Sequence, residues 1–177
     1  MIFHKIRLFL IIGLFISALG LSFAGTPQLV ILLWVTGFFL LWIHVRQGSV
    51  LGALWALRKG DIEGTEARLN ATTRPEWLSR RYQAYYYLAK GLVCFSRTET
   101  ETGAAFLETA LATQKLGKTE QAIVHLNLAH AAFVRKDWTK SQEHAQLAKG
   151  FAIDDLYFQQ RVTELEEALA EQESRKQ

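Results

Sequence analysis

Three histidines in the carboxyl-terminal half, His125, His130 and His144, are the side chains of this sequence best suited to binding a metal ion. Two histidines four residues apart on a helix share one face and can hold one ion. His125 and His130 are five residues apart, and His144 belongs to the next predicted helix. A site made of all three remains an alternative to surface or groove histidines. We therefore predict no metal ion and no cofactor.

Other catalytic patterns are missing from the sequence. It contains no glycine-rich phosphate loop, no GxSxG and no HExxH. Glu164, Glu166 and Glu167 are most simply a solvated helix face, and Asp154-Asp155 is most simply a helix start. Cys94 is the only cysteine, so it has no disulfide partner within the chain, and we expect it to be buried. The sequence predicts that the protein is not an enzyme.

The charge and composition of the chain indicate which classes of binding partner to expect. The chain has 177 residues and a formal net charge of +3, and acidic residues alternate with basic ones from Asp61 onward. A nucleic-acid groove needs a one-sided basic face, so we predict no nucleic-acid partner. Hydrophobic residues make up 50% of the chain, but they are concentrated in its first 45 or so residues.

Two uncharged apolar runs fill this first part, Leu8–Ala24 and Leu29–Val45. Each has about 17 residues, or roughly 25 Å of helix, at the short end of the range for crossing a bilayer. The connection GTPQ, residues 25–28, contains Pro27, which cannot continue the first helix. The sequence predicts a transmembrane hairpin over residues 1–46. A cleaved signal peptide ending at Ala24 is the alternative for the first run.

Basic residues flank the two runs and are absent between them, which predicts the orientation. Lys5 and Arg7 precede the first run, and Trp42 and Arg46 lie at the end of the second. We expect these four residues at the membrane interface, with the lipid bilayer as one partner. The predicted location is a bacterial-type inner (cytoplasmic) membrane, multi-pass, with both termini cytoplasmic.

Residues 47–177 show helix-length segments separated by turn signals. Asp61 and Asp137 are good N-caps for the helices that follow them, and Asp154 could cap the final one. The predicted helices are Gly48–Lys59, Asp61–Thr72, Glu76–Ser96, Glu99–Lys115, Thr119–Arg135, Asp137–Gly150 and Asp154–Arg175.

These segments repeat a common plan. Two stretches have the same order of features: an apolar helix, a basic turn, an aspartate and then an apolar residue. A small residue, Thr65 or Ser141, follows three positions after that apolar residue. The two stretches are LGALWALRKGDIEGTEARLNAT and LNLAHAAFVRKDWTKSQEHAQLA. YYYLAKGLVCFS with ETGAAFLETALA has the same plan. The pattern resembles the tetratricopeptide repeat, a helix–turn–helix unit of about 34 residues. With the apolar runs before it, the chain also resembles the amino-terminal part of HemY-type membrane proteins.

The resemblance implies an all-α fold, in which a short α-solenoid of about three helical hairpins follows the transmembrane hairpin. Small residues are expected where paired helices cross, such as Ser141, Ala145 and Ala148, with Trp138 filling the space at the turn. The last segment is expected to cap the stack. Its apolar face is predicted to be Leu156, Val162, Leu165 and Leu169.

Tetratricopeptide stacks line a concave groove with the first helix of each pair, and the resemblance implies such a groove here. The residues expected to line it for a protein or peptide partner are Tyr86, Lys90, Val93, Leu126, His130 and Phe133. Plain packing between helices is the alternative for each of them. The predicted function is a membrane-anchored scaffold or adaptor for protein–protein interaction at the cytoplasmic face of the inner membrane. The alternative is an accessory or assembly subunit with a structural role in a larger membrane complex.

Overall fold

The computed structural model describes residues 2–22, 27–47 and 49–174. Over these ranges the chain forms nine α-helices and one short 3-10 helix, and it contains no strand. The predicted all-α class is confirmed. The chain divides into two compact units, Met1–Tyr82 and Gln83–Gln177.

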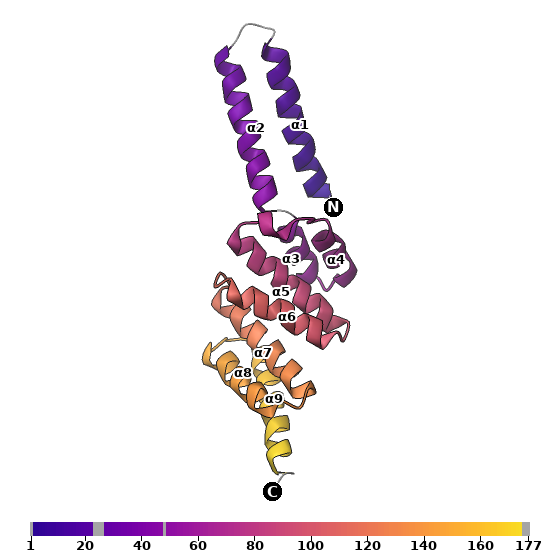
Figure 1. The fold of residues 1–177 in the computed structure, drawn as a ribbon, viewed down its shortest axis with the longest axis vertical. Helices are drawn as coiled ribbons and strands as arrows, with labels where there is room; N and C mark the ends of the chain where they lie inside the picture. Colours follow the sequence, from indigo (N-terminus) through magenta and orange to yellow (C-terminus); the bar gives the residue numbers. More distant parts are fainter. Residues whose placement is uncertain (1, 23–26, 48, 175–177) are drawn as a thin grey trace. The chain divides into compact units, whose positions relative to one another are not determined.

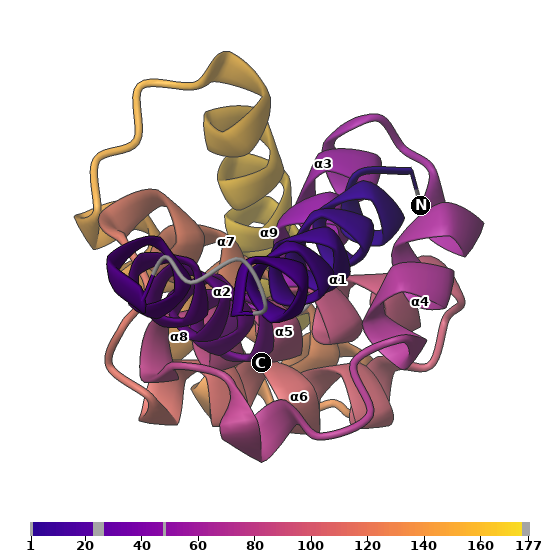
Figure 2. The same cartoon turned by 90° about the horizontal axis from the view of Figure 1, so that it is seen from above.

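The first unit begins with two long helices, α1 (Ile2–Ser22) and α2 (Pro27–Gln47). They lie side by side and run in opposite directions, as Figures 1 and 2 both show. The ring of Phe15 lies against Trp34 and Phe38, with centroid separations of 5.1 and 5.3 Å. Gly37 allows this close packing, because a Cβ atom there would lie 3.2 Å from the Phe15 ring.

The predicted membrane location needs correction. Within the described residues, α1 and α2 included, no helix combines the length and the apolar character needed to cross a membrane. Polar residues occupy the start of α1 and the end of α2, and the apolar stretch left in each is about 17 residues or fewer. At 1.5 Å per residue this stretch is shorter than a hydrocarbon core of about 30 Å. This finding contradicts the multi-pass inner-membrane location and leaves the transmembrane hairpin unsupported. Of the predicted connection GTPQ, Gly25 and Thr26 lie outside the described residues, and Pro27 and Gln28 are the first two residues of α2.

A second helical pair completes the first unit, α3 (Val50–Arg58) and α4 (Ile62–Asn70). The short 3-10 helix η1 (Pro75–Trp77) follows, and Leu78 is extended with ψ 153°. The predicted helix from Glu76 to Ser96 is therefore interrupted, and α5 begins only at Arg80. Leu78 is 2% exposed, so the extended residue buries its side chain.

The second unit contains all but the first three residues of α5 (Arg80–Ser96), followed by α6 (Thr100–Ala112), α7 (Lys118–Val134), α8 (Trp138–Gly150) and α9 (Leu156–Ser174), as Figure 1 shows. One buried cluster joins α5, α6 and α7 through residues such as Leu88, Leu107 and Leu128. Two smaller clusters join α7 and α8 to α9. Cys94 is buried and unbonded to another cysteine, as predicted.

The same turn closes three helical pairs, α3–α4, α5–α6 and α7–α8. Each turn contains a residue with positive φ: Gly60 at 74°, Thr98 at 62° and Lys136 at 61°. These three residues are 38 positions apart in the sequence. The amide of the next residue donates to the carbonyl five positions back in each case, as Asp137 does to Ala132 at 2.9 Å. This is the Schellman arrangement, in which a left-handed residue ends a helix. The chain therefore contains a structural repeat of 38 residues.

Small residues lie where the paired helices cross, again 38 residues apart, at Thr65, Gly103 and Ser141. Thr65 and Ser141 are fully buried. The Ser141 hydroxyl donates to the Ala129 carbonyl at 2.9 Å. The Thr65 hydroxyl lies 3.4 Å from the equivalent Ala53 carbonyl, and it is closer to the Asp61 carbonyl of its own helix cap, at 2.6 Å. The prediction that Ser141, Ala145 and Ala148 form a buried small-residue stripe is confirmed.

Two details of the last helix differ from the prediction. Leu156 is 86% exposed, and its expected place on the apolar face is taken by Phe158, which is 9% exposed. Asp155 rather than Asp154 caps the helix, because its carboxylate accepts from the Phe158 amide at 2.8 Å. The helix therefore starts at Leu156, and its buried face begins two residues later, at Phe158.

Candidate functional site

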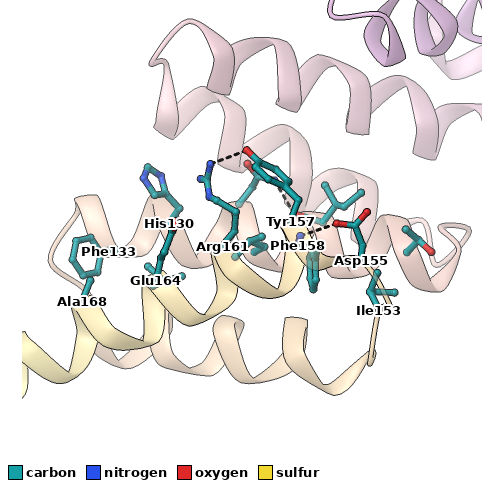
Figure 3. Close-up of a pocket in the computed structure, with 14 residues that line it drawn as sticks. His130, Phe133, Ile153, Asp155, Tyr157, Phe158, Arg161, Glu164 and Ala168 are labelled. Atoms are coloured by element: carbon teal, nitrogen blue, oxygen red, sulfur yellow. Dashed lines mark hydrogen bonds between the residues drawn. The ribbon is translucent and has the colours of Figure 1, made fainter.

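A groove with a volume of about 600 Å³ lies in the second unit, between α7 and α9 and beside the loop that leads to α9. Its apolar lining includes Leu126 and Phe133 from α7 and Phe158 and Leu165 from α9, and Figure 3 shows the labelled members around it. The remaining lining residues are Thr119, Ile123, Asn127, His130, Ile153, Asp155, Tyr157, Arg161, Glu164 and Ala168. A concave space of this size and character is typical of a ligand or peptide site.

Helical periodicity explains how α9 forms one wall of the groove. Its buried stripe, Phe158, Val162, Leu165 and Leu169, follows the i, i+4, i+7, i+11 spacing of one helix face and packs on α7 and α8. A second stripe, displaced by one residue, borders the groove and consists of Tyr157, Arg161, Glu164 and Ala168. The same packing that buries the first stripe therefore points the second toward α7.

Charged groups of both signs border this apolar lining. The Asp155 carboxylate is bound to the start of α9, and the Glu164 carboxylate accepts from the Gln160 amide at 3.0 Å. The Arg161 guanidinium lies 3.4 Å from the Tyr157 hydroxyl, as drawn in Figure 3. The polar groups are thus at the edge of the groove, where they can fix the orientation of an occupant.

His130 on α7 is also a lining residue of the groove, and its side chain is exposed (Figure 3). Partial burial lowers its pKa below the ordinary value of 6.5, and the positive charge of Arg161 lowers it further. Both causes favour the neutral imidazole, which carries one donor and one acceptor nitrogen. At neutral pH His130 therefore offers a hydrogen-bonding group rather than a second positive charge.

The structure brings together only part of the predicted groove. Leu126, His130 and Phe133 all line it. Tyr86 and Val93 are each 4% exposed and offer little surface to a partner.

Lys90 is not among the groove residues either. Its ammonium lies over the rings of Tyr86 and Phe106, at 5.7 and 4.9 Å from their centroids. Cation–π contacts of this kind fix the long side chain on the surface formed by α5 and α6.

Sequence reasoning missed the α9 wall of the groove. We assigned the last helix only the role of a polar cap, so Tyr157, Arg161 and Ala168 were not considered as site residues. A signal was present, because these residues are spaced like the buried stripe and flank it by one position. Recognising it required knowing that Phe158, and not Leu156, begins the buried face.

The histidines considered for a metal site separate into a pair and a single residue. The Nδ1 atoms of His125 on α7 and His144 on α8 are 3.0 Å apart, whereas His130 lines the groove. Among the residues that the structure describes, no group of three or more histidine, cysteine or acidic side chains is arranged to hold a metal ion.

The four residues predicted to lie at a membrane interface are in the first unit. The side chains of Lys5 and Arg7 lie outside the described residues. Trp42 is 59% exposed, and the Arg46 guanidinium lies over its ring at 5.7 Å. This contact is an exposed cation–π pair on the last turn of α2.

Comparison with protein-family models, with curated proteins and with solved structures found no significant match to the chain. The resemblances to the tetratricopeptide repeat and to HemY-type proteins therefore stay predictions that depend on the residues quoted for them.

Proposed function

We propose that this protein is a tetratricopeptide-like scaffold that binds a short segment of a protein partner in the groove between α7 and α9, without chemistry of its own. The single observation that carries the proposal is the groove itself, about 600 Å³ in volume and apolar in its lining, with polar groups at its edge. Peptide segments bind such grooves by inserting apolar side chains and hydrogen-bonding at the rim.

The packing around the groove supports this use. Phe133 contacts Trp138 edge to face, with centroids 5.2 Å apart, and both pack on the cluster of Ala129, Ala145 and Leu165. The apolar lining is thus held in place by buried neighbours before any partner arrives. A site that is ordered in advance loses less conformational entropy on binding.

The three equivalent helical pairs support the solenoid interpretation. The turn residue and the small crossing residue recur at equal spacing in all three, and α9 packs on the last pair. In repeat proteins each unit covers the apolar face of its neighbour, and the last helix presents a polar outer side. Here the outer side of α9 carries exposed residues such as Gln160, Thr163 and Glu167.

Two positions on α9 provide a matched test. Ala168 lines the groove, whereas Ala170 is two residues further on and borders a smaller cavity between α8 and α9. A photo-crosslinking amino acid is placed at either position in the full chain, and the products formed in cells are identified by mass spectrometry. We expect a defined partner to crosslink at position 168 and not at position 170.

Filling the groove is the complementary experiment. Ala168→Phe should reduce capture of the crosslinked partner at least tenfold, while Ala170→Phe should retain it. The melting temperature of each variant shows whether the fold is intact. Equal partner capture by two folded variants would contradict binding in this groove.

A second candidate function is that of an accessory subunit with a structural role. Large apolar side chains on α1 and α2 are exposed, among them Phe9 at 71% and Ile16 at 66%, and exposed apolar patches of this extent mark interaction sites. Helices of a partner subunit would cover them. Phe9→Gln with Ile16→Gln should then release the chain from its complex, whereas Ala168→Phe should not.

A further inference from the structure

The side chains of His125 and His144 form a polar contact between α7 and α8, in addition to the bond from Ser141 to Ala129. Their Nδ1 atoms are 3.0 Å apart and their ring centroids 5.3 Å apart. One Nδ1 atom must donate a proton and the other must accept it, so at least one ring is neutral while the contact exists. When both rings are protonated, two N–H groups face each other and the hydrogen bond is lost.

The pair is also connected to the segment that leads to α9. The His125 ring is stacked on Phe151, with centroids 6.0 Å apart and planes 20° apart. Phe151 ends α8, and Ile153 and Asp155, a few residues further on, line the groove. Phe151 and Ile153 pack on the cluster that holds Phe158 and Val162 of α9. A change at the histidine pair therefore reaches one end of the groove through this connection.

We propose that His125 and His144 are a proton-operated latch, which holds the connection between α8 and α9 in place at neutral pH and releases it when both rings become charged. The inference concerns the fold and does not need the proposed binding function. If the groove does hold a partner, acidification would weaken the groove end formed by Ile153 and Asp155.

The charges around the pair act in both directions. Glu143 on α8 and Glu108 on α6 raise the pKa of His144, while Lys140 on α8 and Arg135 after α7 lower it. On α9, Glu166 is paired with Lys149 at 2.9 Å.

The largest effect on each ring is burial, which lowers the pKa of both histidines below 6.5. The charge of His144 lowers the pKa of His125 further, and Glu143 partly opposes this shift. Because the pKa values are lower in the folded chain, the unfolded chain binds more protons at acidic pH. The stability that the pair provides is therefore complete above pH 6.5 and is lost as the pH falls through the lowered pKa values.

The first test uses the unmodified full chain. Nuclear magnetic resonance titration of the histidine rings should show His125 and His144 titrating in two coupled steps, the second below the ordinary range, as for any strongly interacting pair. His130, which has no histidine partner among the described residues, should titrate in one step and serves as the internal reference. Independent titration of His125 and His144 near pH 6.5 would overturn the proposal.

The second test measures release. Hydrogen exchange of the amides from residues 151 to 158, corrected for the intrinsic effect of pH, should be several-fold faster at pH 5.5 than at pH 7.5, with little change in α5 and α6. His144→Gln keeps a hydrogen-bonding group beside His125 but removes one titrating ring, and should abolish this pH response. His130→Gln should retain it. An unchanged exchange rate in the parent chain, or a full pH response in His144→Gln, would refute the latch.

Discussion

At the scale of single residues, polar side chains at the helix crossings and helix starts bond to backbone groups. Ser141 is fully buried and donates to the Ala129 carbonyl across the α7–α8 crossing. Asp61 and Asp137 cap their helices through the amides of Gly64 and Lys140, at 2.8 and 3.3 Å. These residue types were predicted for these roles, because caps and small crossing residues depend on nearby sequence.

Removal of the Ser141 hydroxyl tests how much the hydrogen bond from Ser141 to Ala129 contributes to stability. Ser141→Ala should lower the free energy of unfolding by about 1 kcal/mol, the typical net contribution of one hydrogen bond. Thr163→Ala is the control, because Thr163 is exposed and bonds only within its own helix. Chemical denaturation should leave this control within about 0.5 kcal/mol of the parent chain. If Thr163→Ala lost as much unfolding free energy as Ser141→Ala, the burial of the Ser141 bond would not explain the loss of stability.

The charge of Arg161 should be detectable at His130. Arg161→Gln removes a positive charge that lowers the pKa of His130, so that pKa should rise toward its ordinary value without reaching it, because burial is the larger cause. Titration of the His130 ring signal gives the measurement. Lys115→Gln, an exposed change in a different loop, should leave the His130 pKa unchanged. A fall in the His130 pKa in Arg161→Gln would show that the two side chains do not interact as described.

At the scale of helical elements, the three pairs share one turn and differ in how closely their helices approach. The α5–α6 pair has glycine on both sides of its crossing, at Gly91 and Gly103, where the other pairs have alanine opposite threonine or serine. A Cβ atom at Gly91 would lie 2.6 Å from the Leu107 side chain and 3.0 Å from the Gly103 carbonyl oxygen. Backbone contact therefore replaces the side-chain hydrogen bond in this pair.

Gly91→Ala should destabilise the second unit, because neither Leu107 nor the Gly103 backbone can move without disturbing the buried cluster. The expected loss is about 1–3 kcal/mol, the usual effect of overpacking. Gly150→Ala is the matched control, because a Cβ atom there meets nothing within 4 Å. Thermal melting should show a lower midpoint for Gly91→Ala only. Equal midpoints would mean that the crossing is looser than the structure shows.

The left-handed turn residues offer a stabilising change. Thr98 and Lys136 occupy positions where the first pair has Gly60, and a left-handed conformation costs a residue with a side chain about 1–2 kcal/mol. Glycine gains entropy in the unfolded chain, so Thr98→Gly should raise stability by only about 0.5–1 kcal/mol. Gly60→Ala should lower it by about 1 kcal/mol. Denaturation midpoints that move in the opposite directions would contradict the turn assignment.

At the scale of the whole molecule, the two compact units expose different surfaces. The second unit buries most of its large apolar residues, although a few, such as Leu156 and Tyr157, are exposed. In the first unit, α1 and α2 bury Ile11 and Ala18 between them but leave large apolar side chains exposed on both helices. The exposed ones include Leu10, Leu19, Ile31, Leu32, Val35, Phe38 and Phe39. Surfaces of this kind are normally covered by another molecule.

Without a covering partner, we expect the purified chain to self-associate through α1 and α2 in aqueous buffer. Phe9→Gln with Ile16→Gln should reduce this association, since both side chains are exposed and glutamine is a good helix former. Ile11→Gln is the contrasting variant. Ile11 is 2% exposed, so its replacement should disrupt the α1–α2 pair. Analytical ultracentrifugation provides the measurement, and unchanged association of the double variant would exclude this face as the cause.

The sequence by itself determined what depends on neighbouring residues: the all-α class, most helix boundaries, the aspartate caps at Asp61 and Asp137, and the small residues at the crossings. Periodicity and turn chemistry act over one or two turns of helix, so they can be read along the chain. The sequence-based predictions were wrong where they inferred three-dimensional placement from composition alone. They assigned a membrane location that the helices do not support, and they placed Leu156 in the buried face of the last helix.

The tertiary structure alone decided which distant residues meet. It paired His125 with His144 and moved His130 away from them, it buried Tyr86 and Val93, and it turned Arg161 and Ala168 of α9 toward α7. Each outcome depends on the rotation of one helix about its axis relative to its neighbour. A shift of one residue turns a helical side chain by about 100°. That rotation is set by packing across the core, and no short stretch of sequence contains it.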